Sequence, residues 1–157
     1  MSAPSGWTDD YLDMLRALIE SGAEFLIVGA HAMAAHGVPR ATVDLDIYVR
    51  ASSENAARVI AALQEFGAPL SAHGVSSEDF ERPGAVYQLG LPPNRIDLLT
   101  RISGVEFDDA WASRIEARIG NLRVPVIGRG PLLENKRASG RDKDLVDVRL
   151  LEQAGEP

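Results

Sequence analysis

A continuous apolar run, Phe25-Leu26-Ile27-Val28, ends at Gly29-Ala30 and is followed by an alanine-rich stretch. Such a short run with a β-branched pair predicts a strand buried on both faces in the middle of a sheet. Residues 31–36 favour a helix, and Gly37 and Pro39 end it. A buried strand that passes through a glycine directly into a helix favours an α/β (α+β) fold, with helices covering a sheet.

Two acids mark the start of a second predicted strand, in the order Asp44-Leu45-Asp46, before the apolar run 47–49. Because side chains alternate along a strand, these two carboxylates point to the same face. Like charges held this close repel each other unless a cation lies between them, and Mg²⁺ prefers carboxylate oxygens. A third acid, Asp97, interrupts an apolar run. If the two strands are neighbours, the three carboxylates converge on a site suited to one or two Mg²⁺ ions and to phosphoryl transfer.

The rest of the chain predicts a mixed sheet of about five strands flanked by helices, in one domain over 1–157 with a core from about residue 8 to 153. Residues 85–89 and 95–100 read as an antiparallel hairpin, and 122–127 as a strand that Pro125 moves toward an edge. Residues 108–119 are a helix or a helix plus a short strand, and 68–83 are irregular. Helices are expected over 8–21, from 52 or 53 to 67, over 132–139 and over 143–153, the last with a core stripe of Leu145, Val146, Val148, Leu150 and Leu151.

Charge and composition exclude several classes of function. The net charge of −7 argues against binding nucleic acid through bulk charge. A local basic cluster, drawn from Lys136, Arg137, Arg141, Lys143 and Arg149, either meets phosphates or forms a solvated helix face. The absence of cysteine excludes disulfides and thiolate metal sites. No apolar run reaches the length of a membrane span and no signal peptide opens the chain, so we expect a soluble, cytoplasmic protein without membrane contact.

The ordered set of a strand ending in Gly29-Ala30, the pair Asp44-Leu45-Asp46 and a later Asp97 resembles the DNA polymerase β-type nucleotidyltransferase superfamily. More narrowly, residues 29–32, 36–37 and 40–42 before the acidic pair are similar to minimal AbiEii-type toxin nucleotidyltransferases of toxin–antitoxin systems. Residues 133–138, 141–144 and Asp147 resemble their lysine-bearing helix and Lys-Asp-x-x-Asp element. The resemblance spans roughly residues 24–150.

The resemblance implies a role for each matched residue. Asp44, Asp46 and Asp97 would be catalytic and would bind Mg²⁺, or Mn²⁺ in its place, with Asp97 also helping to activate an acceptor hydroxyl. The hydroxyl would attack the α-phosphate of a nucleoside triphosphate and release pyrophosphate. The residues implied to bind the nucleotide are Gly29, Ala30, Lys136, Lys143, Asp144 and Asp147.

Other functions stay open at this point. Position 30 is Ala where the superfamily usually has Gly or Ser, and the loss of a hydroxyl contact to phosphate would weaken activity. One alternative is a catalytically degenerate module that binds nucleotide or a protein, and another is modification of a small molecule such as an aminoglycoside. The acceptor implied by the narrower resemblance is RNA, such as a tRNA end, with an antitoxin or a second copy of the chain as partner. Arg40 and Thr42 either reach the nucleotide or fix the loop, His31 lies at the site or in the core, and His36 caps or packs the helix.

Overall fold

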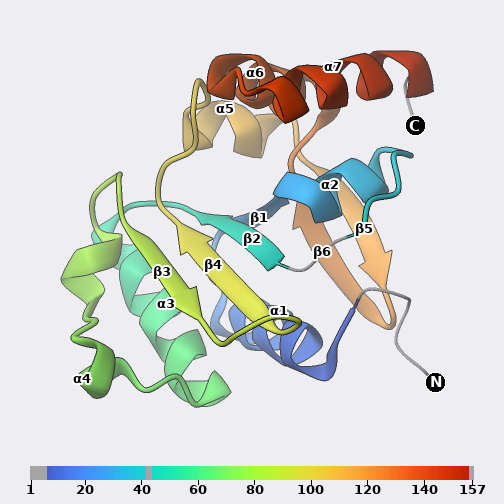
Figure 1. Cartoon of the computed structure of the whole chain (residues 1–157). Coiled ribbons are helices and arrows are strands. Elements are labelled where there is room, and N and C mark those ends of the chain that lie inside the picture. The colour runs from blue at the N-terminus through green and yellow to red at the C-terminus, as the bar shows by residue number, and fades with distance from the viewer. Residues whose placement is uncertain (1–6, 42–43, 156–157) are drawn as a thin grey trace.

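The computed structural model describes residues 7–41 and 44–155, and its centre is a mixed six-stranded sheet (Figure 1). The strand order is β3-β4-β2-β1-β6-β5. Neighbours run antiparallel except for two parallel pairs, β2 with β4 and β1 with β6. The strands are β1 (Phe25–Val28), β2 (Asp44–Val49), β3 (Val86–Leu89), β4 (Arg95–Leu99), β5 (Ile115–Ile119) and β6 (Leu122–Val126).

Two groups of helices lie at opposite ends of the molecule, with the sheet between them (Figure 1). Helices α1 and α3 pack against each other at one end, and α5, α6 and α7 gather at the other. In the described part of the chain, no helix combines the length and the apolar character that crossing a membrane needs. The helices are α1 (Asp9–Ser21), α2 (Gly29–Ala35), α3 (Ser53–Phe66), α4 (Leu70–His73), the 3-10 helix η1 (Ser77–Phe80), α5 (Phe107–Ala112), α6 (Arg129–Ser139) and α7 (Asp142–Ala154).

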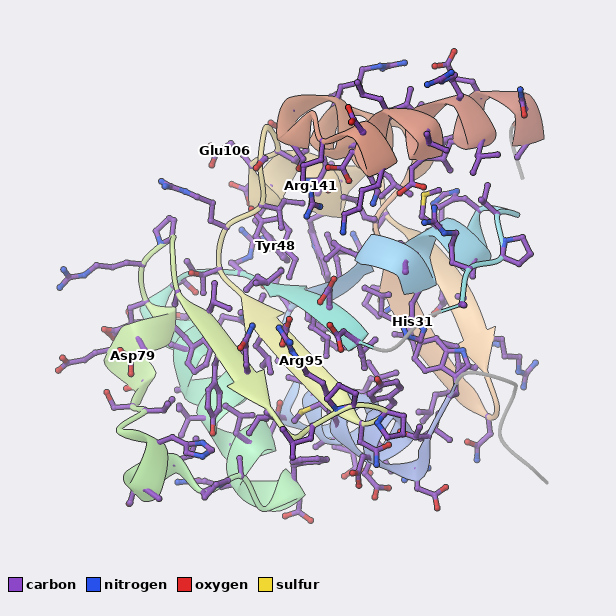
Figure 2. All side chains as sticks on the ribbon, in the orientation of Figure 1. His31, Tyr48, Asp79, Arg95, Glu106 and Arg141 are labelled. Carbon is purple, nitrogen blue, oxygen red and sulfur yellow. The ribbon has the colours of Figure 1, made fainter. Side chains whose placement is uncertain are left out.

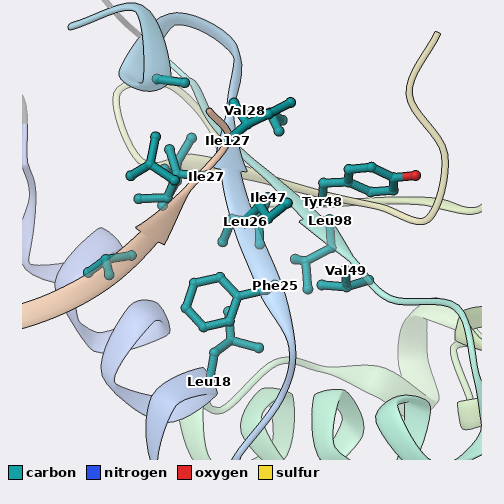
Figure 3. Packing of buried hydrophobic residues seen from close by; sticks show 14 of the residues in the cluster. Leu18, Phe25, Leu26, Ile27, Val28, Ile47, Tyr48, Val49, Leu98 and Ile127 are labelled. Atoms are coloured by element: carbon teal, nitrogen blue, oxygen red, sulfur yellow. The ribbon is translucent and has the colours of Figure 1, made fainter. Parts of the chain in front are cut away.

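One hydrophobic core joins the sheet to the helices. All four residues of β1 are buried, as its unbroken apolar run predicted, because elements cover both of its faces. Leu18 of α1 packs beneath the ring of Phe25, and both side chains are fully buried (Figure 3). The edge strand β3 instead alternates exposed and buried positions, since only one of its faces meets the core. The predicted α+β architecture is therefore confirmed.

The sheet has six strands rather than about five, because residues 108–119 contribute α5 and then β5. The prediction that Pro125 moves its strand to an edge is wrong, since β6 lies between β1 and β5. β6 meets β1 at one register position, Ile27 with Val126, and the Ile127 N–H donates to the Ile27 carbonyl at 3.0 Å. Backbone nitrogens of alternate residues face the same side of a strand, so the nitrogen of Pro125, like that of Ile127, faces β1. Pro125 comes one residue before the position where β6 begins to pair with β1, so its missing N–H removes no hydrogen bond between these strands.

Two further expectations need correction. The segment 68–83, expected to be irregular, contains α4 and η1 and is anchored by the fully buried Phe80. The core stripe expected on α7 is split, because Val148 and Leu151 are buried while Leu145, Val146 and Leu150 are exposed. The buried face of α7 is completed by Asp144 and Asp147. Two carboxylates thus occupy inward positions that a purely apolar stripe would fill, and they need polar partners there.

Candidate functional site

The strand pairing brings the three predicted acids to one end of the sheet. In the parallel pair of β2 and β4, Asp46 lies beside Asp97 and Asp44 beside Arg95. Asp44 and Asp46 share a face because they are two residues apart on one strand. In the antiparallel pair of β1 and β2, Asp46 lies opposite Val28, so the β1-to-α2 turn adjoins the same carboxylates.

Gly29 opens α2 at this turn, with a φ of +69°, and lies against the Asp46 carboxylate. A Cβ atom at position 29 would come within 2.5 Å of Asp46 Oδ2. The resemblance implied that this glycine binds the nucleotide. The structure gives it a second reason, because a side chain here would displace a carboxylate of the site.

We expect Gly29→Ala to lower both stability and ligand affinity. The left-handed backbone costs about 1–2 kcal/mol for a residue with a Cβ, and the added methyl group pushes Asp46 aside. Gly22→Ala is the matched control, since Gly22 has a φ of +75° and a Cβ at that position would meet only open space. Urea unfolding should show a loss for both variants that is larger for Gly29→Ala, whereas Mn²⁺ and nucleotide binding should fall only for Gly29→Ala. Equal binding by the two variants would contradict the steric explanation.

Burial and charge both act on Asp46. Burial, followed by the charges of Asp97 and Asp44, raises the pKa of Asp46 to about 6, against the opposing effects of Arg95 and Lys136. Oδ1 of Asp44 is buried and has no hydrogen-bond partner among the described residues. A concentration of carboxylates with an unsatisfied buried oxygen attracts a cation.

Arg95 is the cation that meets these acids in the structure. Its Nε and Nη2 atoms donate to Asp97 Oδ1 and Oδ2 at 3.1 and 3.2 Å, and its Nε lies 3.8 Å from Asp44 Oδ2. Figure 2 shows Arg95 over the sheet, below Arg141 of the helix pair. Arg95 was not among the predicted site residues, although the alternation that joined Asp44 to Asp46 also puts Arg95 and Asp97 on one face.

The opposite wall comes from α6 and α7. Because β6 runs parallel to β1, it ends at the end of the sheet where Gly29 lies, and α6 begins there. Lys136 of α6 lies 3.0 Å from Asp147 Oδ2 and 3.6 Å from Asp144 Oδ1, and burial lowers its pKa despite the nearby acids. Burial opposes ionisation of Asp144, but the hydrogen bond and charge of Arg141, with Lys136, lower its pKa. Arg40 pairs with Asp147.

A cavity of about 340 Å³ separates the two walls. It brings together eight of the nine predicted site residues, and Asp97 does not line it in the described part of the chain. The predicted residues that do are Gly29, Ala30, Asp44, Asp46, Lys136, Lys143, Asp144 and Asp147, joined by Arg40 and Arg141, which were not among them. A larger hollow of about 630 Å³, around Tyr48, Arg50 and residues 100–109, contains none of these residues.

Three of the other side chains that the sequence left open have structural partners. His36 is the C-cap of α2, and its Nε2 lies 2.8 Å from the Ile127 carbonyl oxygen, so it packs in the core. His31 packs between Trp7 and Tyr11, outside the cavity lining, and burial lowers its pKa to about 4. The ion pair with Asp147 attaches Arg40, which follows α2, to α7. Thr42 lies outside the described residues.

Whether the site fits a divalent cation depends on Asp97. Carboxylate oxygens are the donors that Mg²⁺ prefers, and Asp44 and Asp46 offer them at the cavity wall. Within residues 7–41 and 44–155, however, no group of three or more His, Asp or Glu side chains is arranged to hold a metal ion. The side chain of Asp97 is 12% exposed and is held by Arg95. Asp44 and Asp46 therefore fit a divalent cation, while the third carboxylate, that of Asp97, is paired with Arg95.

Comparison with solved structures shows which fold this is. No family model and no curated protein matches the sequence. The chain is similar to a proposed nucleotidyltransferase from Thermotoga maritima, with a TM-score of 0.54 and 17% identity over 92% of this chain and 91% of that one. It is equally similar to ANT(2")-Ia in complex with adenylyl-2"-tobramycin, with a TM-score of 0.54 and 17% identity over 91% of this chain and 86% of that one. At such identity the likeness establishes the fold, and the site's chemistry must be argued from its own residues.

Proposed function

We propose that this chain is a Mg²⁺-dependent nucleotidyltransferase, which moves a nucleoside monophosphate from a nucleoside triphosphate to an acceptor hydroxyl. One observation carries the proposal: Asp44 and Asp46 adjoin Asp97 at one end of the sheet and face Lys136 across a cavity of about 340 Å³. A half-buried acidic wall opposite a cation suits a metal-bound polyphosphate, whose charge needs both kinds of partner. The nucleotidyltransferase fold adds to this argument by analogy.

The residues divide the work of this reaction. A divalent cation held by Asp44 and Asp46, with Mn²⁺ able to replace Mg²⁺, supplies charge stabilisation to the phosphates when bound. Lys136 acts as a point charge for the triphosphate. The backbone of Gly29 and Ala30 lines the same cavity and adjoins the bound triphosphate. The acceptor oxygen forms a bond to the α-phosphorus as the bond to the bridging oxygen breaks, and pyrophosphate leaves. We assign the hydroxyl proton to Asp97.

The acceptor is proposed at the level of class. An RNA hydroxyl, such as a tRNA end, follows from the resemblance to AbiEii-type toxins, and with it come an antitoxin partner and a cytoplasmic site of action. A small cationic acceptor follows instead from the fold shared with ANT(2")-Ia, whose complex contains adenylyl-2"-tobramycin. The net charge of −7 suits a cationic small molecule better than a polyanion.

A second candidate is a binding module that has lost catalysis. Two observations favour it: Asp97 is held by Arg95, and position 30 is Ala and offers no hydroxyl to a phosphate. Such a module would bind nucleoside triphosphate or a protein without turnover.

The test starts from nucleotide binding. The four nucleoside triphosphates are titrated calorimetrically, with and without Mg²⁺, against the wild type, the Asp44→Ala/Asp46→Ala variant and Asp13→Asn, whose side chain is 60% exposed. Metal-dependent binding that only the double variant loses supports the site. Transfer of an α-labelled nucleotide to total RNA or to an aminoglycoside then names the acceptor class. Binding without transfer to any acceptor would favour the binding module. No binding of any triphosphate would contradict the nucleotidyltransferase and leave only a module that binds a protein.

A further inference from the structure

Arg95 occupies the position where the proposed chemistry needs a cation. Its guanidinium makes a two-pronged hydrogen bond to both oxygens of Asp97 and lies 3.8 Å from Asp44 Oδ2. One positive group thus bridges carboxylates from two neighbouring strands. A bidentate arginine–carboxylate pair is among the stronger polar contacts in proteins, and a ligand that needs the same oxygens must break it.

The placement of Arg95 follows from the backbone. Arg95 and Asp97 lie two residues apart on β4 and share a face, and Arg95 is the register partner of Asp44 on β2. The guanidinium therefore reaches its own strand's acid and the neighbouring strand's acid without leaving the sheet. Its side chain is 32% exposed, so it has solvent to move into, whereas the side chain of Asp97 is 12% exposed.

We propose that Arg95 is an internal counter-ion that competes with the divalent cation for Asp97 and Asp44. In the cation-free protein Arg95 neutralises the acidic wall, and loading with the cation requires its guanidinium to swing away. Asp97 then becomes available to the cation and to the acceptor hydroxyl. This inference rests on the proposed function, since it needs a divalent cation at Asp44 and Asp46.

Two features of the site agree with this competition. Asp44 keeps one buried oxygen, Oδ1, without a hydrogen-bond partner among the described residues, so Arg95 satisfies the acids only in part. The described residues hold no set of three carboxylates arranged for a metal, and Asp97, the third predicted ligand, accepts hydrogen bonds from Arg95. A cation of higher charge density can displace the guanidinium and use these oxygens fully.

The test is a thermodynamic cycle on Mn²⁺ binding, measured by calorimetry and by electron paramagnetic resonance of free Mn²⁺, without nucleotide. The proteins are the wild type, Asp44→Asn as the variant that lacks the site, Arg95→Met, Asp97→Asn and the double variant Arg95→Met/Asp97→Asn. We expect Arg95→Met to tighten Mn²⁺ binding about tenfold, which corresponds to about 1.4 kcal/mol. The double variant should lose most of this gain, because Asp97, the carboxylate that Arg95 holds by two hydrogen bonds, is then absent.

Two controls separate competition from other effects. Lys143→Met removes a positive charge from the same cavity, where Lys143 is paired with neither Asp44 nor Asp97 in the described part of the chain, so a general field effect would tighten Mn²⁺ binding in this variant as well. Arg95→Gln keeps a polar side chain and serves if Arg95→Met unfolds, which circular dichroism reports.

The outcomes distinguish the two proposals. If the wild type binds Mn²⁺ and Asp44→Asn loses it, but Arg95→Met and Arg95→Gln bind as the wild type does, the counter-ion inference is wrong and the proposed function stands. A gain that persists in full in the double variant, or that Lys143→Met matches, also overturns the inference. If no protein binds Mn²⁺ in the presence or absence of nucleotide, the proposed function itself fails.

Discussion

Asp46→Asn should abolish nucleotidyl transfer and at the same time stabilise the metal-free protein at neutral pH. The substitution keeps the shape that fits against Gly29 but removes the charge that would hold the divalent cation. Loss of several kcal/mol of charge stabilisation corresponds to a fall in transfer rate of about 10³-fold or more.

The gain in stability follows from the pKa of Asp46, which the folded protein raises to about 6, mainly by burial and then by Asp97 and Asp44. A carboxyl with a raised pKa destabilises the fold once it ionises, so the wild type loses stability as pH rises from about 4 to about 6. Asn has no charge to lose. After allowance for solvent screening, we expect the variant to be about 1–2 kcal/mol more stable at pH 7.5 and equal to the wild type near pH 4.

Urea unfolding at the two pH values in the presence of a chelator measures this difference, and a labelled-nucleotide assay measures transfer. Asp13→Asn, an exposed aspartate on α1, should change neither quantity. A variant at position 46 that is less stable than the wild type at pH 7.5 would show that Asp46 is stabilised by its surroundings when charged.

Lys136→Met should destabilise the protein and weaken triphosphate binding together. The Lys136 ammonium lies within 3.0 Å of Asp147 and 3.6 Å of Asp144, and both acids are buried. Removing one partner of a buried ion pair costs about 3–5 kcal/mol. Here Arg40 and Arg141 remain as partners of the acids, so we expect a loss of about 2 kcal/mol.

The same variant should bind nucleoside triphosphate about 10- to 100-fold more weakly, because it loses a charge-assisted contact. Adding Asp147→Asn to Lys136→Met should restore part of the stability without restoring the affinity. If the double variant is instead further destabilised, then Asp147 stabilises the fold chiefly through Arg40.

The site was predictable where one local rule sufficed. The period-2 alternation of a strand placed Asp44 and Asp46 on one face from sequence alone, and the same rule applied to Arg95 and Asp97 would have revealed their pairing. The adjacency of β2 and β4 depends on strand order, which spacing along the chain does not encode. The sequence therefore left the convergence of the three acids conditional on that order, and the structure places β2 beside β4.

Other features needed contacts between distant elements. The contact of Gly29 with Asp46 depends on the register that sets Val28 opposite Asp46, so the sequence offered only a nucleotide-binding role for this glycine. The helical period of α7 predicted an apolar stripe, yet Asp144 and Asp147 take inward positions. Lys136 and Arg40 reach them from other elements, and Arg141 pairs with Asp144 at the start of α7 itself. Patterns of hydrophobicity do not reveal which buried acids will find partners.

The strands β1 and β6 are joined at a single register position, and this short pairing affects how the cavity can open. The acids lie on β2 and β4, within the four-strand part β3-β4-β2-β1 of the sheet. Lys136 lies on α6, which comes directly after β6, on the other side of the short pairing between β1 and β6. Local opening at this pairing would separate the walls without disturbing the long ladders on either side. Native-state hydrogen exchange should therefore report two cooperative units, and a ligand that bridges the walls should merge their exchange into one.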